Sequence, residues 1–238
     1  MAAPRECIDR GQDSSIAVQT TILCARPSLR AAADRTLKPV ANLADAGDVR
    51  ARLRQNLVLR HLQDDEWKEL EPQLAVEEYA KGATLESQGD LSMQQYFILD
   101  GILKRVVSNP AGKEMILRFA AETEIETSYA AWKLKTPIPF SILAVRPVRA
   151  AKLSMERWVE FMARHPHIKN EFELQVMQLM SEVMAHTITL HLLNATGRVH
   201  RFVRKHGALL VRIPKKELAS YLNLTPETLS RLKQRGKI

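Results

Sequence analysis

Residues 214–231 read PKKELASYLNLTPETLSR, and their spacing predicts two short helices joined by a turn. The inward-facing positions of the first helix are small or apolar: Leu218, Ala219 and Leu222. The alanine is small where a second helix has to cross closely. Thr225 can cap the second helix, and Pro226 suits its first position, because that position needs no hydrogen-bonded N–H. The stretch is therefore typical of a helix-turn-helix.

Three polar side chains of the second helix point away from this inner face. Glu227, Ser230 and Arg231 are spaced i, i+3 and i+4, so they share one outward surface. Arginine can bind guanine O6 and N7 in the major groove of DNA, and glutamate can accept a hydrogen bond from cytosine N4. The same spacing also fits a surface ion pair between Glu227 and Arg231, which would add only a few tenths of a kcal/mol.

The distribution of charge favours nucleic acid. The chain has 238 residues and a net charge of +8. Residues 195–238 hold 11 lysines and arginines against the two acids Glu217 and Glu227, whereas residues 1–194 hold 24 basic and 25 acidic side chains. A nearly neutral body with a basic end is typical of a protein whose end meets a polyanion.

Residues 75–154 have a different pattern, in which glycines separate short apolar or alternating runs. These glycines are Gly82, Gly89, Gly101 and Gly112. Runs such as YFIL at 96–99 and MILRF at 115–119 have the length of strands, and NPAG at 109–112 is typical of a hairpin turn. Turn residues about every ten positions predict an antiparallel sandwich or roll.

Residues 166–193 contain no glycine and predict one long helix that Pro166 opens. Mostly apolar residues recur along it at alternating spacings of four and three: Val176, Met180, Val183, Thr187 and Leu190. We interpret this heptad-like seam as a dimerisation surface, because the helix is longer than its own domain needs. A buried domain helix is the alternative interpretation.

A hinge is expected after this helix. Asn194 can end one helix and cap the next, and Gly197 follows it closely. A short helix from Arg198 to His206 and an extended run from Leu209 to Ile213 are predicted before the helix-turn-helix.

From about residue 50 to the C-terminus, the chain resembles the Crp/Fnr family of bacterial transcription regulators. Three blocks carry the resemblance. The first is the glycine pattern of a β-roll, in KGATL at 81–85, QGD at 88–90, FILDG at 97–101 and GKE at 112–114. The second is NATGRV at 194–199, and the third is PETLSR at 226–231. The last of these is similar to the reading helix of the Fnr type rather than the Crp type.

The resemblance implies an α+β fold with a fixed order of domains. A flexible arm over residues 1–45 would precede a double-stranded β-roll with flanking helices over residues 46–165. The dimerisation helix would span residues 166–193. Residues 194–238 would form a helix-turn-helix domain of winged-helix type, with the wing missing because little sequence follows the reading helix.

The effector is not implied by the resemblance. Family members that bind cyclic nucleotides carry Gly-Glu and then Arg-Ser/Thr-Ala, where the arginine clamps the cyclic phosphate. Here the region reads EIETS at 124–128, and residues 136–142 contain no basic side chain, so we do not expect cyclic AMP to bind. Iron–sulfur members need a cluster of cysteines, and Cys7 and Cys24 are too few to build one.

Four histidines could serve haem or metal sensing as ligands: His165, His167, His186 and His191. Surface or helix-cap histidines are the more common explanation of such residues, so no metal site is predicted and haem stays a minor option.

The resemblance implies a homodimer that reads an inverted repeat of TTGAT-like sequence, with RNA polymerase as a further partner. Glu227, Ser230 and Arg231 would read the bases. The DNA phosphates would be held by Lys215, Lys216, Thr225, Lys233 and Arg235. The alternative is a ligand- or haem-sensing regulatory module that acts through protein contacts, with weak or no DNA binding.

Other classes of protein are not expected. The sequence has no Ser/His/Asp order, no His-Glu-x-x-His pattern and no phosphate loop, so no catalytic residues are predicted and an enzyme is improbable. Charged residues interrupt the first twenty positions, which argues against an export signal. With only two cysteines and no long apolar stretch, the expected location is the cytoplasm, away from membranes.

Overall fold

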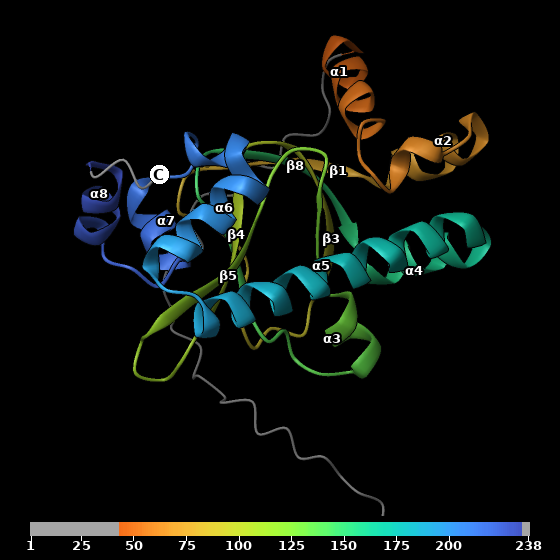
Figure 1. Cartoon of the computed structure of the whole chain (residues 1–238). Helices are drawn as coiled ribbons and strands as arrows, with labels where there is room; N and C mark the ends of the chain where they lie inside the picture. Colours follow the sequence, from red (N-terminus) through yellow and green to blue (C-terminus); the bar gives the residue numbers. More distant parts are fainter. Residues whose placement is uncertain (1–42, 235–238) are drawn as a thin grey trace, which may run out of the picture.

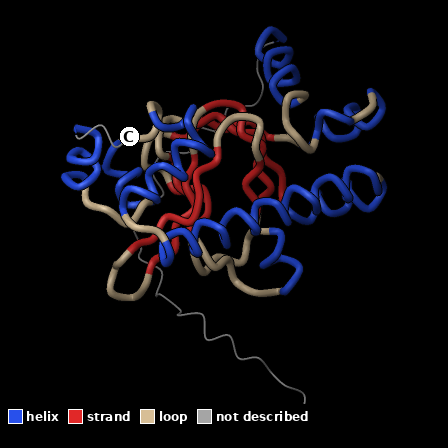
Figure 2. Tube along the Cα trace, viewed as in Figure 1, coloured by secondary structure: helices blue, strands red, loops and turns tan. Residues whose placement is uncertain are grey.

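The computed structural model describes residues 43–234, with side chains from residue 47 onward, as a roll of antiparallel strands surrounded by helices (Figures 1 and 2). Residues 1–42 and 235–238 lie outside the described residues, and with them most of the predicted N-terminal arm, both cysteines and Arg235.

Eight strands in the described part of the chain confirm the predicted roll. They form two antiparallel sheets with the strand orders β1-β8-β3-β6 and β2-β7-β4-β5. The strands are β1 Ala75–Tyr79, β2 Thr84–Glu86, β3 Gln94–Asp100, β4 Leu103–Ser108, β5 Glu114–Ala120, β6 Ile125–Thr127, β7 Ser141–Ala144 and β8 Val148–Ser154. The predicted hairpin turn joins β4 to β5, with the N–H of Gly112 donating to the carbonyl of Asn109 at 2.9 Å.

Within residues 43–234, eight α-helices surround the two sheets. They are α1 Leu43–Leu53, α2 Asp64–Leu70, α3 Tyr129–Leu134, α4 Met155–Arg164, α5 Pro166–Leu192, α6 Ala195–Leu210, α7 Lys215–Tyr221 and α8 Pro226–Gln234. Short 3-10 helices cover Leu59–His61 and Glu71–Gln73. In Figure 1, α5 runs along the roll, with α1 and α2 at one end of the molecule and α7 and α8 at the other.

The main core joins the first sheet to the helices α4 and α5. Trp158 of α4 is fully buried and makes edge-to-face contacts with Phe97 of β3 and Phe172 of α5, with ring centroids 5.3 and 5.4 Å apart. Such aromatic contacts add to the stability gained by burying apolar area. They fix the first half of α5 against the roll, and Pro166 stands at the first position of this helix as predicted.

A second core lies on the other side of the roll, where the C-terminal helices pack on β4 and β5. Its buried side chains come from the roll (Ile102, Val106, Ile116, Phe119 and Val145) and from the C-terminal segment (Val199, Phe202, Ile213, Leu218, Ala219, Tyr221, Leu222 and Leu229). The helix-turn-helix is therefore packed directly on the sheet.

The extended run expected from Leu209 to Ile213 is wrong. Helix α6 continues to Leu210 through an irregular residue, His206, which has φ −130° and ψ 36°. The N–H groups of Arg212 and Ile213 both donate to the carbonyl of Leu209, at 3.0 and 2.9 Å, so the segment closes as a turn. The apolar run resembles a strand, but no strand edge is paired with it and Ile213 is buried in the second core.

Within residues 43–234, no helix combines the length and the apolar character needed to cross a membrane.

Gly101 is required by the turn between β3 and β4. Its φ is +98°, and a Cβ atom there would lie 2.3 Å from the carbonyl oxygen of Pro147. We expect Gly101→Ala to lower the free energy of unfolding by about 3 kcal/mol or more, because the left-handed strain adds to a clash with backbone. Gly112→Ala is the matched control, since Gly112 has φ +78° with open space around it and should cost about 1 kcal/mol. Urea unfolding measures both, and equal losses would show that the close approach is unimportant.

Candidate nucleic-acid interface and sensor site

Helices α7 and α8 form the predicted helix-turn-helix. The turn between them passes through Asn223, whose φ of +51° lies in the left-handed region, and the N–H of Leu224 donates to the carbonyl of Ala219 at 2.9 Å. The predicted cap is confirmed, because the hydroxyl of Thr225 accepts a hydrogen bond from the N–H of Thr228 at 3.2 Å. Pro226 occupies the first position of α8.

The residues predicted to read bases lie on the outer face of α8. Glu227 and Arg231 are exposed, while Leu229 on the opposite face is buried in the second core. Ser230 is half-buried, and its hydroxyl donates to the carbonyl of Pro226 at 2.7 Å, which leaves its oxygen able to accept. Hydrogen bonds from its own backbone N–H and from the Thr225 side chain lower the pKa of Glu227, so this carboxylate is an ionised acceptor.

The lysines predicted to contact phosphates lie at the start of α7 and near the end of α8. Lys215 and Lys216 are exposed at the start of α7, and Lys233 is exposed near the end of α8. Thr225 is exposed, but its hydroxyl already caps α8. Arg235 lies outside the described residues.

Ion pairs add to the packing of the C-terminal helices on the roll. Lys104 of β4 donates to Glu217 of α7 at 2.8 Å, and Arg212 donates to Glu122 at 2.8 Å. Partial burial alone would raise the pKa of Glu122, but the hydrogen bonds from Arg212 and from backbone N–H groups lower it to about 2. These contacts connect residues that are far apart in the sequence.

The cap predicted at Asn194 is present, and an arginine holds the helices on either side of it. The side chain of Asn194 caps α6 by accepting from the N–H of Gly197 at 2.9 Å. Arg198 donates to the carbonyls of Leu190 and Leu193, at 2.8 and 2.9 Å, at the end of α5. The same guanidinium donates to the carbonyls of residues 222 and 223 in the turn between α7 and α8. Arg198 therefore ties the long helix to the helix-turn-helix.

The apolar surface of α5 is rotated relative to the predicted seam. Of the five predicted positions, only Met180 is exposed, and Val176, Val183, Thr187 and Leu190 are half-buried beside the roll. The exposed apolar side chains of α5 are Leu174, Met177, Met180, Met184, Ile188 and Leu192. Because neighbouring residues differ by 100° around a helix, the exposed stripe lies about one position away from the seam.

The histidines do not gather at one site. His165 contacts Glu66 and Glu69, at 3.0 and 2.9 Å, and His167 lies 3.3 Å from Glu66. His186 is buried on α5 and stacks on Tyr221 of α7, with centroids 3.7 Å apart. His191 is exposed. Among the residues described, no three His, Cys, Asp or Glu side chains are arranged to hold a metal ion.

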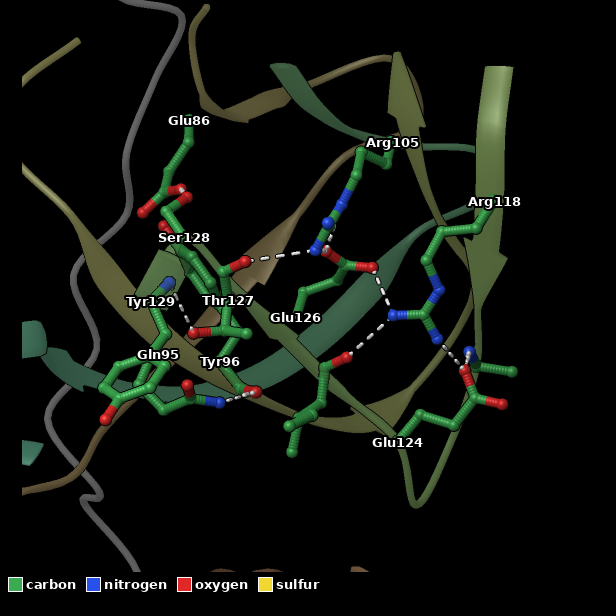
Figure 3. A network of polar contacts seen from close by, with 12 residues as sticks. Glu86, Gln95, Tyr96, Arg105, Arg118, Glu124, Glu126, Thr127, Ser128 and Tyr129 are labelled. Carbon is green, nitrogen blue, oxygen red and sulfur yellow. Dashed lines mark hydrogen bonds and ion pairs between the residues drawn. The ribbon is translucent and has the colours of Figure 1, made fainter. Parts of the chain in front are cut away.

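A network of buried charges lies inside the roll, in the region where the resemblance places the cyclic-nucleotide clamp. Figure 3 shows Glu126 of β6 between two arginines. Its carboxylate accepts from Arg105 of β4 at 2.6 Å and from Arg118 of β5 at 2.7 Å. Arg118 also donates to Glu124 at 2.7 Å, and the guanidinium of Arg105 lies 3.9 Å from the centre of the Phe140 ring. The roll interior is thus occupied by the chain's own ion pairs.

Glu86 extends this network. It accepts from the hydroxyl of Ser128 and from the N–H of Gln94, both at 2.6 Å. Burial raises the pKa of the Glu86 carboxyl to about 7, and the hydrogen bonds offset only part of this effect. Near neutral pH, the buried Glu86 carboxyl is therefore partly protonated and partly ionised.

Sequence reasoning did not single out Arg105, Arg118 or Glu126. A signal was available, because Arg105 stands between Leu103 and Val107 on the inward side of an alternating strand. Charged residues are seldom fully buried unless they are paired. An arginine at an inward strand position therefore indicates a buried partner, although it does not say which residue that partner is.

The raised pKa of Glu86 predicts a specific pH dependence. The folded protein holds this proton more tightly than the unfolded chain, so this group makes stability fall as the pH rises from 4.5 to about 7. Glu86→Gln mimics the protonated form. The difference between its free energy of unfolding and that of the wild-type protein should therefore grow by about 3 kcal/mol in favour of the variant across that interval.

Urea unfolding at several pH values measures this difference. Glu78→Gln is the matched control, because it removes the same side-chain charge at an exposed position on β1. If the difference for Glu86→Gln varies with pH no more than the difference for Glu78→Gln, the pKa of Glu86 is the same in the folded and the unfolded chain.

Comparison with known proteins shows what this chain is similar to. Residues 76–165 match the cyclic nucleotide-binding domain. The nitrogen fixation regulation protein FixK of Bradyrhizobium diazoefficiens is 23% identical over 164 residues, which cover 64% of this chain and 68% of FixK.

Two solved structures show the same fold. The regulator CLP of Xanthomonas campestris has a TM-score of 0.61 at 15% identity, covering 73% of this chain and 92% of CLP. FixK2 of Bradyrhizobium japonicum has a TM-score of 0.60 at 15% identity, covering 68% of this chain and 86% of FixK2. The matched domain, the FixK relative and the shared fold agree with the resemblance to the Crp/Fnr family that the sequence motifs indicate.

Proposed function

We propose that this protein is a sequence-specific DNA-binding transcription regulator that acts as a homodimer. The observation that carries the proposal is the exposed face of α8, on which Glu227 and Arg231 stand clear of the second core. This helix belongs to the segment that holds the excess positive charge of the chain. An exposed helix with charged residues of both signs, flanked by lysines, suits the major groove and the phosphates beside it.

The reading residues suit a TTGAT-like inverted repeat. Arg231 would bind the guanine, Glu227 the cytosine opposite or beside it, and Ser230 the edge of a thymine. A dimer presents its two reading helices on one side of the duplex, so the half-sites should lie about 10–11 base pairs apart. Lys215, Lys216 and Lys233 would contact phosphates and position the protein without selecting sequence.

Dimerisation would use the exposed stripe of α5. Met177 and Met184 are 62% and 65% exposed, and Ile188 is 49% exposed. A continuous apolar stripe of this length is unusual on the surface of a monomer and is buried when two helices pair. A twofold axis along α5 would also supply the two reading helices that an inverted repeat requires.

The signal is proposed to differ from cyclic AMP. The interior of the roll is filled by the ion pairs of Glu126 with Arg105 and Arg118, and a cyclic phosphate there would have to break them. Leaving such a buried charge unpaired costs several kcal/mol. We propose RNA polymerase as a further partner and the cytoplasm as the location, because the resemblance to the Crp/Fnr family implies both.

Two substitutions separate base reading from phosphate contact. We expect Arg231→Ala to weaken binding by about 1–3 kcal/mol and to relax the preference at the G·C pair. Lys216→Ala should weaken all sequences alike and reduce the slope of log K against log salt by about one. Fluorescence anisotropy with a TTGAT inverted repeat and with a scrambled duplex, at several salt concentrations, measures both effects.

Lys68→Ala on α2 is the control, since Lys68 is exposed far from α8 in the fold and should leave binding unchanged. If Arg231→Ala keeps the same sequence preference, another surface reads the DNA. If the wild-type protein shows no salt-dependent binding at all, a regulatory module that acts through protein contacts is favoured instead.

The dimer surface is tested on α5. Met184→Glu would place like charges face to face at the centre of the exposed stripe and should give monomers in sedimentation equilibrium. Gln178→Glu is the matched control, because Gln178 is exposed on the same helix but lies about 120° around it from Met184. If the Met184→Glu protein remains dimeric, the dimer is formed by another surface.

A further inference from the structure

A small basic pocket lies where the roll, the long helix and the C-terminal helices meet. Its lining comes from β5, α5, α6 and α7, and it encloses about 30 Å³ beside an opening to solvent. A water molecule needs roughly 10–15 Å³ of such space, so the pocket has room for about two waters or a small ion. In Figure 1 these four elements lie next to one another at the end of the molecule that carries the helix-turn-helix.

The lining of this pocket is strongly cationic. Four of its side chains carry a positive charge: Arg118, Arg198, Arg201 and Lys205. Glu182 is the single acid among the lining residues, and Lys205 pairs with it at 2.9 Å. Arg198 is engaged by the backbone carbonyls of the hinge, which are neutral. The charge of Arg118 is offset by Glu124 and Glu126, so the remaining positive charge at the space comes from Arg198 and Arg201.

Among the residues that the structure describes, two buried nitrogen atoms at the pocket have no hydrogen-bond partner. They are Nε2 of His186 and Nε of Arg118, and their residues are only 8% and 7% exposed. A buried polar atom without a partner costs about 1–3 kcal/mol, so native proteins seldom leave two of them beside one space. The other nitrogens of Arg118 are used by Glu124 and Glu126, which shows that Nε is the atom left for a ligand.

We propose that this pocket binds a small oxyanion, namely a phosphate group, whose oxygens accept from Arg118 Nε and His186 Nε2 while Arg201 neutralises its charge. Charge-assisted hydrogen bonds to oxygen are among the strongest in proteins, and the guanidinium group matches phosphate geometry. An ordered water could accept from these donors but would leave the excess positive charge uncompensated. The size of the space fits the phosphate group alone, so the rest of a phosphorylated molecule would lie at the opening.

The position of the site indicates what its occupancy would couple. Arg118 belongs to the buried network of the roll, and His186 stacks on Tyr221 of the first helix of the helix-turn-helix. A ligand held by both would tie the sensor domain to α7. Control of DNA binding by this ligand rests on the proposed function, whereas binding of the anion does not.

The test follows the His186 ring by NMR in the full chain while inorganic phosphate is added at constant ionic strength. In the free protein, burial and the charges of His206 and Arg201 lower the pKa of His186 to about 4. The charged and titratable groups around the ring are Arg118 on β5, Glu182 on α5, Arg198, Arg201, Lys205 and His206 on α6, and Tyr221 on α7. An anion favours the imidazolium form, so phosphate should raise this pKa by about one unit or more, in a saturable way.

Matched variants on α6 locate the effect. Arg201→Gln should weaken phosphate binding about tenfold, the loss expected for one charge-assisted contact. Arg204→Gln removes an equal charge from the same helix at an exposed position outside the pocket lining, and should change the affinity less than about twofold. Ribose 5-phosphate is titrated in parallel, and tighter binding than inorganic phosphate would identify a phosphorylated metabolite as the source of the group.

Three results would overturn the proposal. They are a His186 signal that does not respond to phosphate, an equal response to chloride, and equal losses for Arg201→Gln and Arg204→Gln, which would indicate diffuse screening. If Arg201→Gln fails to fold, the response of the wild-type His186 ring still decides. Because no DNA is present, failure of DNA binding in the earlier experiment leaves this result unaffected, and the reverse also holds.

Discussion

The carboxylate of Glu126 fixes the two sheets of the roll against each other. It projects from β6 in the first sheet and accepts hydrogen bonds from Arg105 and Arg118 on β4 and β5 of the second sheet. Removing three charges from water is costly, and their attraction offsets that cost only when each hydrogen bond is well aligned. The network therefore tolerates little movement. It also fixes the position of the edge of the roll that faces α5.

Strand β5 carries this constraint to the surface of the roll. Arg118 faces the buried network, whereas the next residue, Phe119, packs on Tyr221 of α7 with ring centroids 5.1 Å apart. Tyr221 in turn stacks on His186 of the long helix. A change of charge inside the roll would thus reach the helix-turn-helix through two adjacent residues of one strand, since packed interiors transmit small displacements.

The long helix α5 serves two surfaces, which explains why its pattern misled the sequence analysis. Phe172, Leu179 and His186 face the roll, while a stripe centred on Met184 is exposed. Both faces are rich in apolar residues, so a spacing of four and three can be drawn along either edge of the helix. The predicted seam falls between the two faces, and only the packing of α5 on the roll shows which side remains for a partner.

The sequence by itself determined the features that depend on neighbouring residues. Glycine in left-handed turns, the caps at Asn194 and Thr225, Pro226 at the start of α8 and the outward spacing of Glu227 and Arg231 all follow from local geometry. Only the tertiary structure decided the pairs that join distant elements: Lys104 with Glu217, Arg105 with Glu126, and His186 with Tyr221. Their partners lie 21 to 113 positions apart along the chain. Periodicity states which side of an element is buried, but the partner of a buried charge is set by the register and packing of elements distant in sequence.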